Sequence, residues 1–125
     1  MSDSSPLQDL DLSFLYEIAD GSNEFIIESI DMLLQQAPEL LQNISDSIAA
    51  QDWVTAGAAS HKLKPSMGFF GMLACQELLQ EIEILCKAGG QDPAAISAKY
   101  TQVNDIIGNN LKELSRIRAE KEAEL

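Results

Sequence analysis

The sequence predicts an all-α protein: an antiparallel four-helix bundle with a short additional helix at the N-terminus. Apolar residues recur at alternating intervals of three and four over long segments, as in amphipathic helices. No segment alternates apolar and polar residues with the period of two that a strand requires. Long amphipathic helices joined by short connections pack as an antiparallel bundle. A chain of 125 residues is long enough for one core and too short for two comfortable domains.

The first helix is expected from about Asp9 or Asp11 to Asp20, where Gly21 ends it. Its inward-facing residues are expected to be Leu12, Leu15 and Ile18.

The second helix is expected to begin near Ser22 or Asn23, because either side chain can cap it. Pro38 interrupts the helix without changing the phase of its apolar stripe, which predicts a bend or a one-turn break. The stripe consists of Ile26, Ile30, Leu33, Ala37, Leu40, Ile44 and Ile48.

Asp52 is expected to cap a third helix, which Gly68 and Gly71 punctuate at its end. The fourth helix is expected from about Met72 to Ala88, because two glycines follow. The predicted inner face of the third helix is Ala56, Ala59, Leu63, Met67 and Phe70. That of the fourth is Cys75, Leu78 or Leu79, Ile82 and Leu85.

Asp92 followed by Pro93 is typical of the start of a helix, here the fifth. Its tail, RIRAEKEAEL, carries charges on all sides and is expected to protrude into solvent. The predicted organisation is a disordered N-terminus over 1–8, a helical bundle over 9–118 and a charged helix end over 119–125. The inner residues of the fifth helix are expected to be Ile96, Tyr100, Val103, Ile107, Leu111 and Leu114.

The composition narrows the class of partner. A net charge of −12 argues against nucleic acid and anionic membranes, because both would repel the chain. No segment approaches the roughly 20 apolar residues of a membrane span, and the acidic start MSDSSPLQDLDL is unlike a signal peptide. Cys75 and Cys86 lie about 16 Å apart along one helix, too far for a disulfide, and are expected to be small core residues. Two free thiols in a chain without a leader predict the reducing cytoplasm.

The single histidine, His61, lies in the segment ASHKLKPSMGFFG. At roughly 100° per residue it falls about 160° from the centre of the inner face of the third helix. An ordinary exposed face would carry Glu, Lys and Gln, whereas four of the five residues one or two turns away are small or compact. The imidazole is therefore expected to stand on a low patch that a partner can approach closely, with one cation beside it. The neighbours are Gly57, Ala58, Lys64, Pro65 and Gly68.

The third and fourth helices are expected to form a hairpin that turns near Gly71, which places His61 opposite residues 81–83. Glu83 is the polar group best placed to accept the Nδ1 proton and so to leave a lone pair on Nε2. The alternative, that Glu83 is only a solvated charge, stays open from the sequence alone.

The sequence lacks the motifs that several other kinds of functional site require. One histidine without clustered cysteines does not make an ordinary zinc site. The chain has no serine elbow, glycine-rich phosphate loop or ATP-binding motif, and no Glu-x-x-His of the di-iron bundles. A nucleophile with a cation but no nucleotide pocket favours a relay over a complete enzyme.

The segment His61-Lys62-Leu63-Lys64, with Ser66 and Gly71, resembles the motif of histidine-containing phosphotransfer (HPt) domains. The resemblance extends over most of the chain. It implies a four-helix bundle whose exposed histidine accepts a phosphoryl group from the aspartate of a response-regulator receiver domain and passes it to another receiver. This chain is expected to be a phosphocarrier without a kinase or ATP-binding domain of its own.

By this resemblance His61 is the phospho-acceptor, Lys64 lies near the phosphoryl oxygens, and Glu83 occupies a position where the family often places a polar partner of the histidine. Gly57, Ala58, Pro65 and Gly68 are the expected docking residues. The expected partners are receiver domains and a hybrid sensor histidine kinase. No cofactor of its own is expected, and Mg²⁺ is expected on the receiver.

One departure from the family concerns Pro65, which stands where glycine commonly follows the lysine. Proline is compact, so access to His61 should survive, but it removes the amide that would bond the His61 carbonyl. Two alternatives to a phosphocarrier remain open. One is a non-catalytic adaptor that binds a receiver or kinase without phosphotransfer, and the other is a bundle that dimerises through its last helix.

Overall fold

The computed structural model describes residues 9–125, so the expectation of disorder over residues 1–8 lies outside the described residues. Within 9–125 the chain forms five α-helices and no strand, which confirms the predicted fold class. The helices are α1 (Ser13–Ala19), α2 (Asn23–Ala49), α3 (Trp53–Phe69), α4 (Leu73–Lys87) and α5 (Pro93–Ala123).

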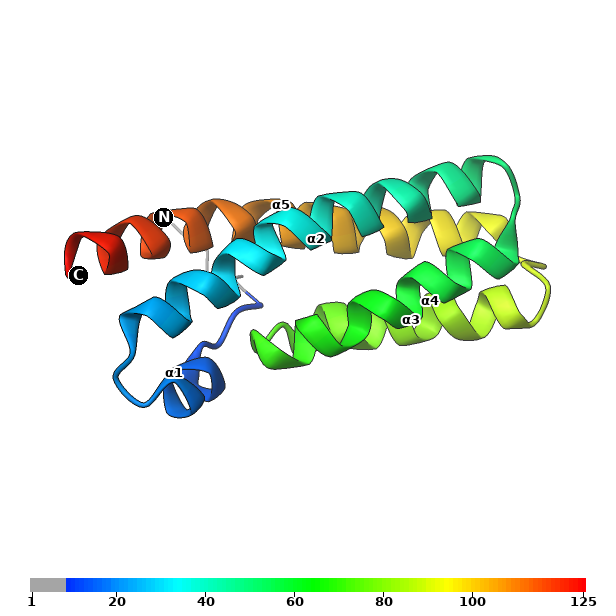
Figure 1. The fold of residues 1–125 in the computed structure, drawn as a ribbon. Coiled ribbons are helices and arrows are strands. Elements are labelled where there is room, and N and C mark those ends of the chain that lie inside the picture. Colours follow the sequence, from blue (N-terminus) through cyan, green and yellow to red (C-terminus); the bar gives the residue numbers. More distant parts are fainter. Residues whose placement is uncertain (1–8) are drawn as a thin grey trace, which may run out of the picture.

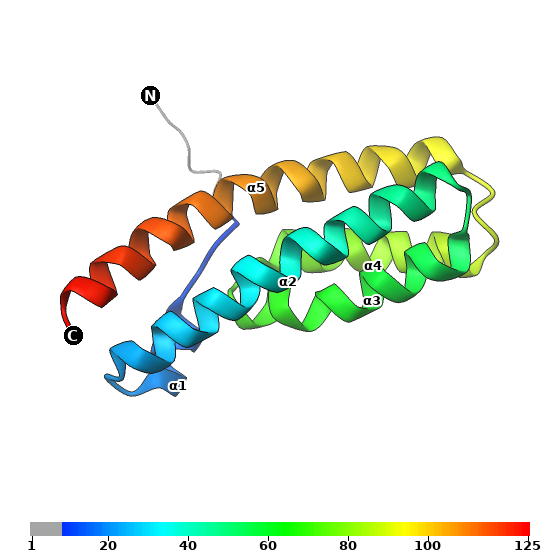
Figure 2. The same ribbon diagram turned by 45° about the horizontal axis from the view of Figure 1, so that its top comes forward.

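Helices α2 to α5 run alternately in opposite directions as an antiparallel bundle (Figure 1). Helices α2 and α5 are the longest, and at one end they extend beyond the α3–α4 hairpin (Figures 1 and 2). The short helix α1 lies at that end and packs against α2. The α3–α4 hairpin thus lies away from the end at which α5 terminates (Figure 1).

The predicted apolar stripes form the core with few exceptions. All five inner residues predicted for α3 are buried, and so are the α2 residues except Ile48, which is partly buried. One prediction was wrong, because Ile18 in α1 is 48% exposed. Four further predicted residues are only partly buried against the core, namely Leu12, Leu85, Tyr100 and Leu111. In α4, Cys86 is buried in addition to the predicted residues. A residue at the edge of an apolar stripe is buried or exposed according to the angle at which the neighbouring helix crosses.

Predicted helix caps occur at three helix starts. The side chains of Ser22, Asp52 and Asp92 accept hydrogen bonds from backbone amides three residues later. Pro38 lies inside an unbroken α2, so the one-turn break considered for this position does not occur.

The cap of helix α4 comes from a residue that is distant in the sequence. Its preceding residue, Met72, makes no side-chain cap. The carboxylate of Asp9 instead accepts hydrogen bonds from the amides of Ala74 and Cys75, at 2.9 and 2.8 Å. The Asp9 carbonyl accepts a further bond from Asn110 in α5. Asp9 therefore ties the start of α4 to α5, whereas the sequence suggested it as the start of the first helix.

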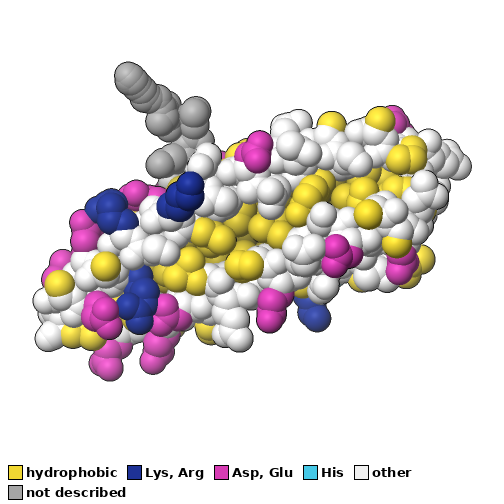
Figure 3. Space-filling model, turned by 90° about the horizontal axis from the view of Figure 1, so that it is seen from above, with side chains coloured by type: hydrophobic (Ala, Val, Ile, Leu, Met, Phe, Trp, Pro, Cys, Tyr) yellow, Lys and Arg dark blue, Asp and Glu magenta, His cyan; other side chains and the backbone are white. Residues whose placement is uncertain are grey.

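The sequence led us to expect that the C-terminal tail protrudes into solvent, but part of it packs against the bundle. Ile117 is buried in the core, and Arg118 pairs with Asp31 of α2 through Nε at 2.6 Å from Oδ1. Lys121 lies over the ring of Tyr16 in α1. Seen from above, apolar side chains follow the seam between α2 and α5, and charged side chains gather at the end where α5 terminates (Figure 3). Arg118 thus ties the tail to α2, whereas Arg116 pairs within α5 with Glu113 and Glu120.

Cys75 and Cys86 are both free and buried, as predicted. Burial, with the nearby charge of Asp9, raises the pKa of the Cys75 thiol to about 12. Burial also raises the pKa of the Cys86 thiol. Both sulfurs therefore stay protonated at neutral pH and act as small apolar residues.

None of the helices described over residues 9–125 is long and apolar enough to cross a membrane.

Candidate functional site

His61 projects from the outer face of α3. Its side chain is 67% exposed, whereas Leu63 and Met67 on the same helix are fully buried. The position of the imidazole opposite the core therefore agrees with the helical-wheel argument. A ring held on a helix in this way presents one edge to solvent and the other to the neighbouring helix.

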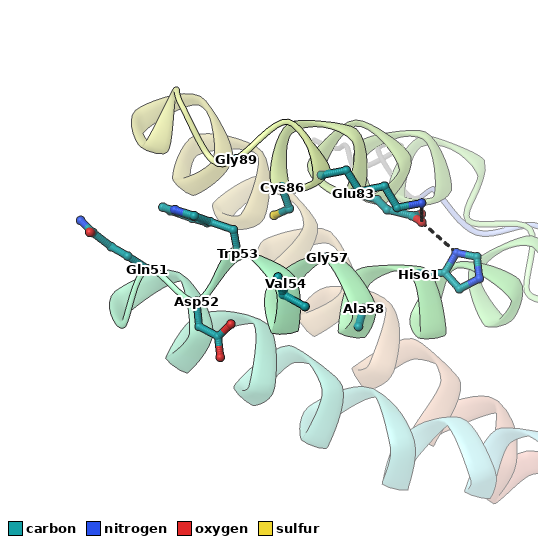
Figure 4. Close-up of a pocket in the computed structure, with 11 residues that line it drawn as sticks. Gln51, Asp52, Trp53, Val54, Gly57, Ala58, His61, Glu83, Cys86 and Gly89 are labelled. Carbon is teal, nitrogen blue, oxygen red and sulfur yellow. Dashed lines mark ion pairs between the residues drawn. The ribbon is translucent and has the colours of Figure 1, made fainter.

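Glu83 on α4 faces this ring across the hairpin (Figure 4). Its Oε2 lies 3.0 Å from His61 Nδ1, a separation at which a protonated Nδ1 donates to a carboxylate. The Glu83 side chain is only 6% exposed, so the alternative of a solvated surface charge is wrong. The two residues lie equally far from Met72 at the hairpin turn, and for this reason the antiparallel register brings them together.

Two lysines complete the surroundings of the Glu83 carboxylate. Nζ of Lys64 on α3 lies 2.8 Å from Oε1, and this side chain is 19% exposed. Nζ of Lys87, in the last turn of α4, lies 3.0 Å from Oε2 and its side chain is 74% exposed. Lys64 also donates to the Oε1 atom of Gln80. Among residues 9–125, Oε1 of Glu83 has no aligned hydrogen-bond donor, so its pairing with Lys64 is mainly one of charge.

These neighbours determine the charge of Glu83. Burial alone would raise its pKa, but pairing with Lys64 and Lys87, together with His61, lowers the pKa to about 2. Glu83 is consequently a carboxylate throughout the physiological pH range. The site combines a buried anion, two ammonium groups and an exposed imidazole within one hairpin.

The four small residues around His61 are not equivalent. Ala58 and Pro65 are exposed, as a docking surface requires. Gly57 is buried, and a Cβ atom at this position would stand 3.1 Å from Cβ of Cys86. This glycine lets α3 and α4 approach closely, and it also lines the open cavity beside His61.

Gly68 is half-buried, and a Cβ atom there would meet the amide of Gln76 on α4. The docking role thus stays a prediction that the geometry favours mainly for Ala58 and Pro65.

An open cavity of about 800 Å³ lies beside His61, between the start of α3 and the end of α4 (Figure 4). Val54, one of its lining residues, is among the most exposed large apolar side chains of the described chain. The sequence analysis singled out neither Val54 nor Lys87. The signal for Lys87 was present, since it lies four residues after Glu83 on the same helix face. The lining includes Trp53, Val54, Ala58, His61, Glu83 and Lys87.

Comparison with known proteins agrees with this geometry. A family model described as "Hpt domain" matches residues 28–119. The chain belongs to the Hpt family. The match spans α3 and α4 with the His61 hairpin and confirms the resemblance drawn from the sequence.

One curated protein and one solved structure are similar to this member of the Hpt family. The phosphorelay intermediate protein rdeA of Dictyostelium discoideum is 29% identical over 83 residues, which are 66% of this chain and 33% of that protein. The chain thus matches only about a third of the length of this relative. The crystal structure of the HPT domain from the Hpt sensor hybrid histidine kinase of Shewanella superposes with a TM-score of 0.75 at 20% identity. The superposition covers 90% of this chain and 95% of that domain, so the two share a fold.

Among the described residues of this Hpt protein, no group of three or more His, Cys, Asp and Glu side chains is arranged to hold a metal ion.

Proposed function

We propose that this protein is a phosphocarrier of a His-Asp phosphorelay, in which Nε2 of His61 accepts a phosphoryl group from the aspartyl phosphate of a receiver domain and passes it to another receiver. The observation that carries the proposal is the pairing of a buried Glu83 carboxylate with Nδ1 of an exposed histidine. It occurs in a chain that belongs to the Hpt family.

Glu83 gives the imidazole the tautomer that the reaction needs. With the proton on Nδ1 directed at Oε2, the lone pair of Nε2 faces the exposed side of the ring. That lone pair attacks phosphorus while the bond from phosphorus to the aspartate oxygen breaks, and the electron pair leaves with the carboxylate. The ring keeps its Nδ1 proton and becomes positively charged, which the Glu83 carboxylate at 3.0 Å stabilises.

Lys64 is proposed to offset part of the charge on the phosphoryl oxygens. Its ammonium group is paired with Glu83, so it would divide its interaction between the carboxylate and the incoming group. Phosphoryl transfer depends mainly on positioning and charge neutralisation. We propose that Mg²⁺ and the remaining acidic groups belong to the receiver.

The partners we propose are response-regulator receiver domains and a hybrid sensor histidine kinase. As a phosphocarrier, this bundle would receive the phosphoryl group from a receiver domain and not from ATP. The two buried, protonated thiols suit a reducing compartment, and the cytoplasm is therefore the proposed location.

The test is incubation with a receiver domain charged by acetyl phosphate, followed by detection of acid-labile, base-stable phosphate. The unaltered protein should take up label and His61→Gln should take up none. Because His61 is largely exposed, His61→Gln should shift the free energy of unfolding by less than about 0.5 kcal/mol. Uptake of label by His61→Gln would show that a residue other than His61 accepts the phosphoryl group. No label on the unaltered protein would favour the adaptor or the dimerising bundle.

A further inference from the structure

Val54 is an exposed apolar residue near the site that the proposed reaction does not explain. It lies in the first turn of α3, seven residues before His61, and is 84% exposed. Seven residues make nearly two turns, so its side chain lies on the same face of the helix as the imidazole, about 10 Å away along the axis. A single exposed apolar side chain is ordinary on a protein surface. The surroundings of Val54 therefore decide whether it has a role.

The exposed face of α3 is as apolar as its buried face. The exposed residues Val54, Ala58, His61 and Pro65 follow one another at intervals of four, three and four, which places them in one stripe. Apart from the imidazole, no side chain in this stripe is polar. Apolar residues on both sides are typical of a helix that is covered on both sides. The core covers only the inner side of α3, so the outer stripe is left for a partner.

A hollow beside the stripe is formed before any partner binds. The cavity of about 800 Å³ next to His61 is lined on α3 by Trp53, Val54 and Ala58 (Figure 4). Trp53 packs against Gly90 in the connection between α4 and α5, where a Cβ atom would stand 2.3 Å from the indole ring. The wall of the hollow is thereby fixed. A preformed apolar hollow takes an apolar side chain at a low entropic cost.

The charges around the stripe fit an acidic partner. The chain has 20 Asp and Glu residues, yet α3 alone among the helices of the described chain carries none. The exposed ammonium groups of Lys62 and Lys87 lie beside the stripe. The two acidic residues that line the cavity are already engaged, because Glu83 pairs with lysines and Asp52 caps α3. An acidic surface is therefore attracted here although the whole chain is strongly acidic.

We propose that Val54 is a specificity-determining residue, which receives an apolar side chain that the receiver domain carries about 10 Å from its phosphorylated aspartate. This inference rests on the proposed function, which supplies the receiver as the partner. The phosphoryl group and the acidic groups of the receiver would face the lysines, while its apolar side chain enters the hollow. A second copy of this chain fits less well, because its net charge of −12 repels the first copy and its docking would cover His61.

The test uses the only tryptophan of the chain, Trp53, as a reporter in the wall of the hollow. Protein labelled with 5-fluorotryptophan gives one fluorine NMR signal, and titration with the receiver of the phosphotransfer assay should shift it and yield a Kd. Val54→Ala should weaken binding by up to about tenfold, because two methyl groups are no longer buried. Val54→Ile should bind like the unaltered protein. At saturating receiver the transfer rate of Val54→Ala should be unchanged, since the side chain contributes binding alone.

A charged variant tests the electrostatic part of the proposal. Val54→Asp should weaken binding more than Val54→Ala does, and the difference between the two should shrink at high salt. Ile18→Asp makes the same kind of change at a 48% exposed position of α1 and should leave the Kd unchanged. Because both positions are exposed, all these variants should fold, and circular dichroism would verify it.

Equal Kd values for Val54→Ala and the unaltered protein would overturn the proposal, and so would a receiver that binds without moving the fluorine signal. A dimer of the unaltered protein that Val54→Asp abolishes would assign the stripe to a second copy instead. If His61 accepts no phosphate, the proposed function fails. A receiver that still binds in a manner dependent on Val54 would then support the docking role alone, and the absence of binding would overturn it.

Discussion

The Nζ atom of Lys64 lies 2.8 Å from Oε1 of Glu83, and both side chains are largely withdrawn from solvent. This pair crosses from α3 to α4 directly beside the exposed His61. A buried ion pair is costly to break on one side, because the remaining charge is left without a partner. The charges that would serve the phosphoryl group therefore also hold the hairpin together.

Lys64→Ala is expected to slow phosphoryl transfer while leaving His61 able to accept phosphate. Loss of one charge-stabilising group costs on the order of 10²-fold in enclosed active sites, and this more open site should lose less. Single-turnover transfer at saturating phosphorylated receiver gives the rate. Lys62→Ala, at the exposed neighbouring lysine, is the control. A Lys64→Ala rate equal to that of the control would refute the assigned role.

Glu83→Gln is expected to lower stability at neutral pH and to lose this deficit in acid. The folded-state pKa of Glu83 is depressed to about 2, so its contribution is present above the unfolded value near 4.5. It fades as the pH falls from about 4.5 towards 2, where the carboxyl becomes protonated in the folded state as well. Urea unfolding of both proteins across this range measures the difference. A deficit of constant size down to pH 2 would contradict the ion pairing.

Asp9→Ala is expected to destabilise the fold by about 1 kcal/mol, or up to 2, because the first amides of α4 lose the carboxylate that caps them. Asp105→Ala removes an equal charge from an exposed position of α5 and should change stability by less than about 0.5 kcal/mol. Urea unfolding at neutral pH compares the two. Equal stabilities would show that the distant cap contributes nothing.

Pro65→Gln is expected to restore an amide that can donate to the His61 carbonyl and to raise the free energy of unfolding by up to about 3 kcal/mol. The longer side chain should at the same time weaken receiver docking, since position 65 is exposed one turn from His61. Pro65→Gly, which stays small, should keep full transfer. Thermal unfolding and receiver affinity are measured together. A Pro65→Gln variant that is more stable and fully active would show that openness is not what this position supplies.

The helices and the exposed place of His61 were predictable because both depend on local geometry. Apolar residues at intervals of three and four define which side of a helix faces the core, and His61 lies opposite that side in α3. The meeting of His61 with Glu83 followed from the antiparallel register of one hairpin, which depends only on where the chain turns.

Other features of the site were decided only by the tertiary structure, because they depend on distances between helices that no local sequence pattern encodes. Glu83 could be placed opposite His61 from the sequence, but its burial and its sharing between two lysines required the packed hairpin. Gly57 belongs to the α3–α4 contact because those helices come close enough there to leave no room for a side chain.

The same reason explains the remaining differences at the other end of the bundle. The tail RIRAEKEAEL has the charge pattern of a solvated helix end, yet Ile117 is buried because α5 continues along α2. Arg118 then finds Asp31, a residue far away in the sequence. Asp9 likewise reaches the start of α4 only because the fold brings residues 65 positions apart together. Such pairings are set by where whole helices come to rest, and the residues that form them carry no local signal of their partners.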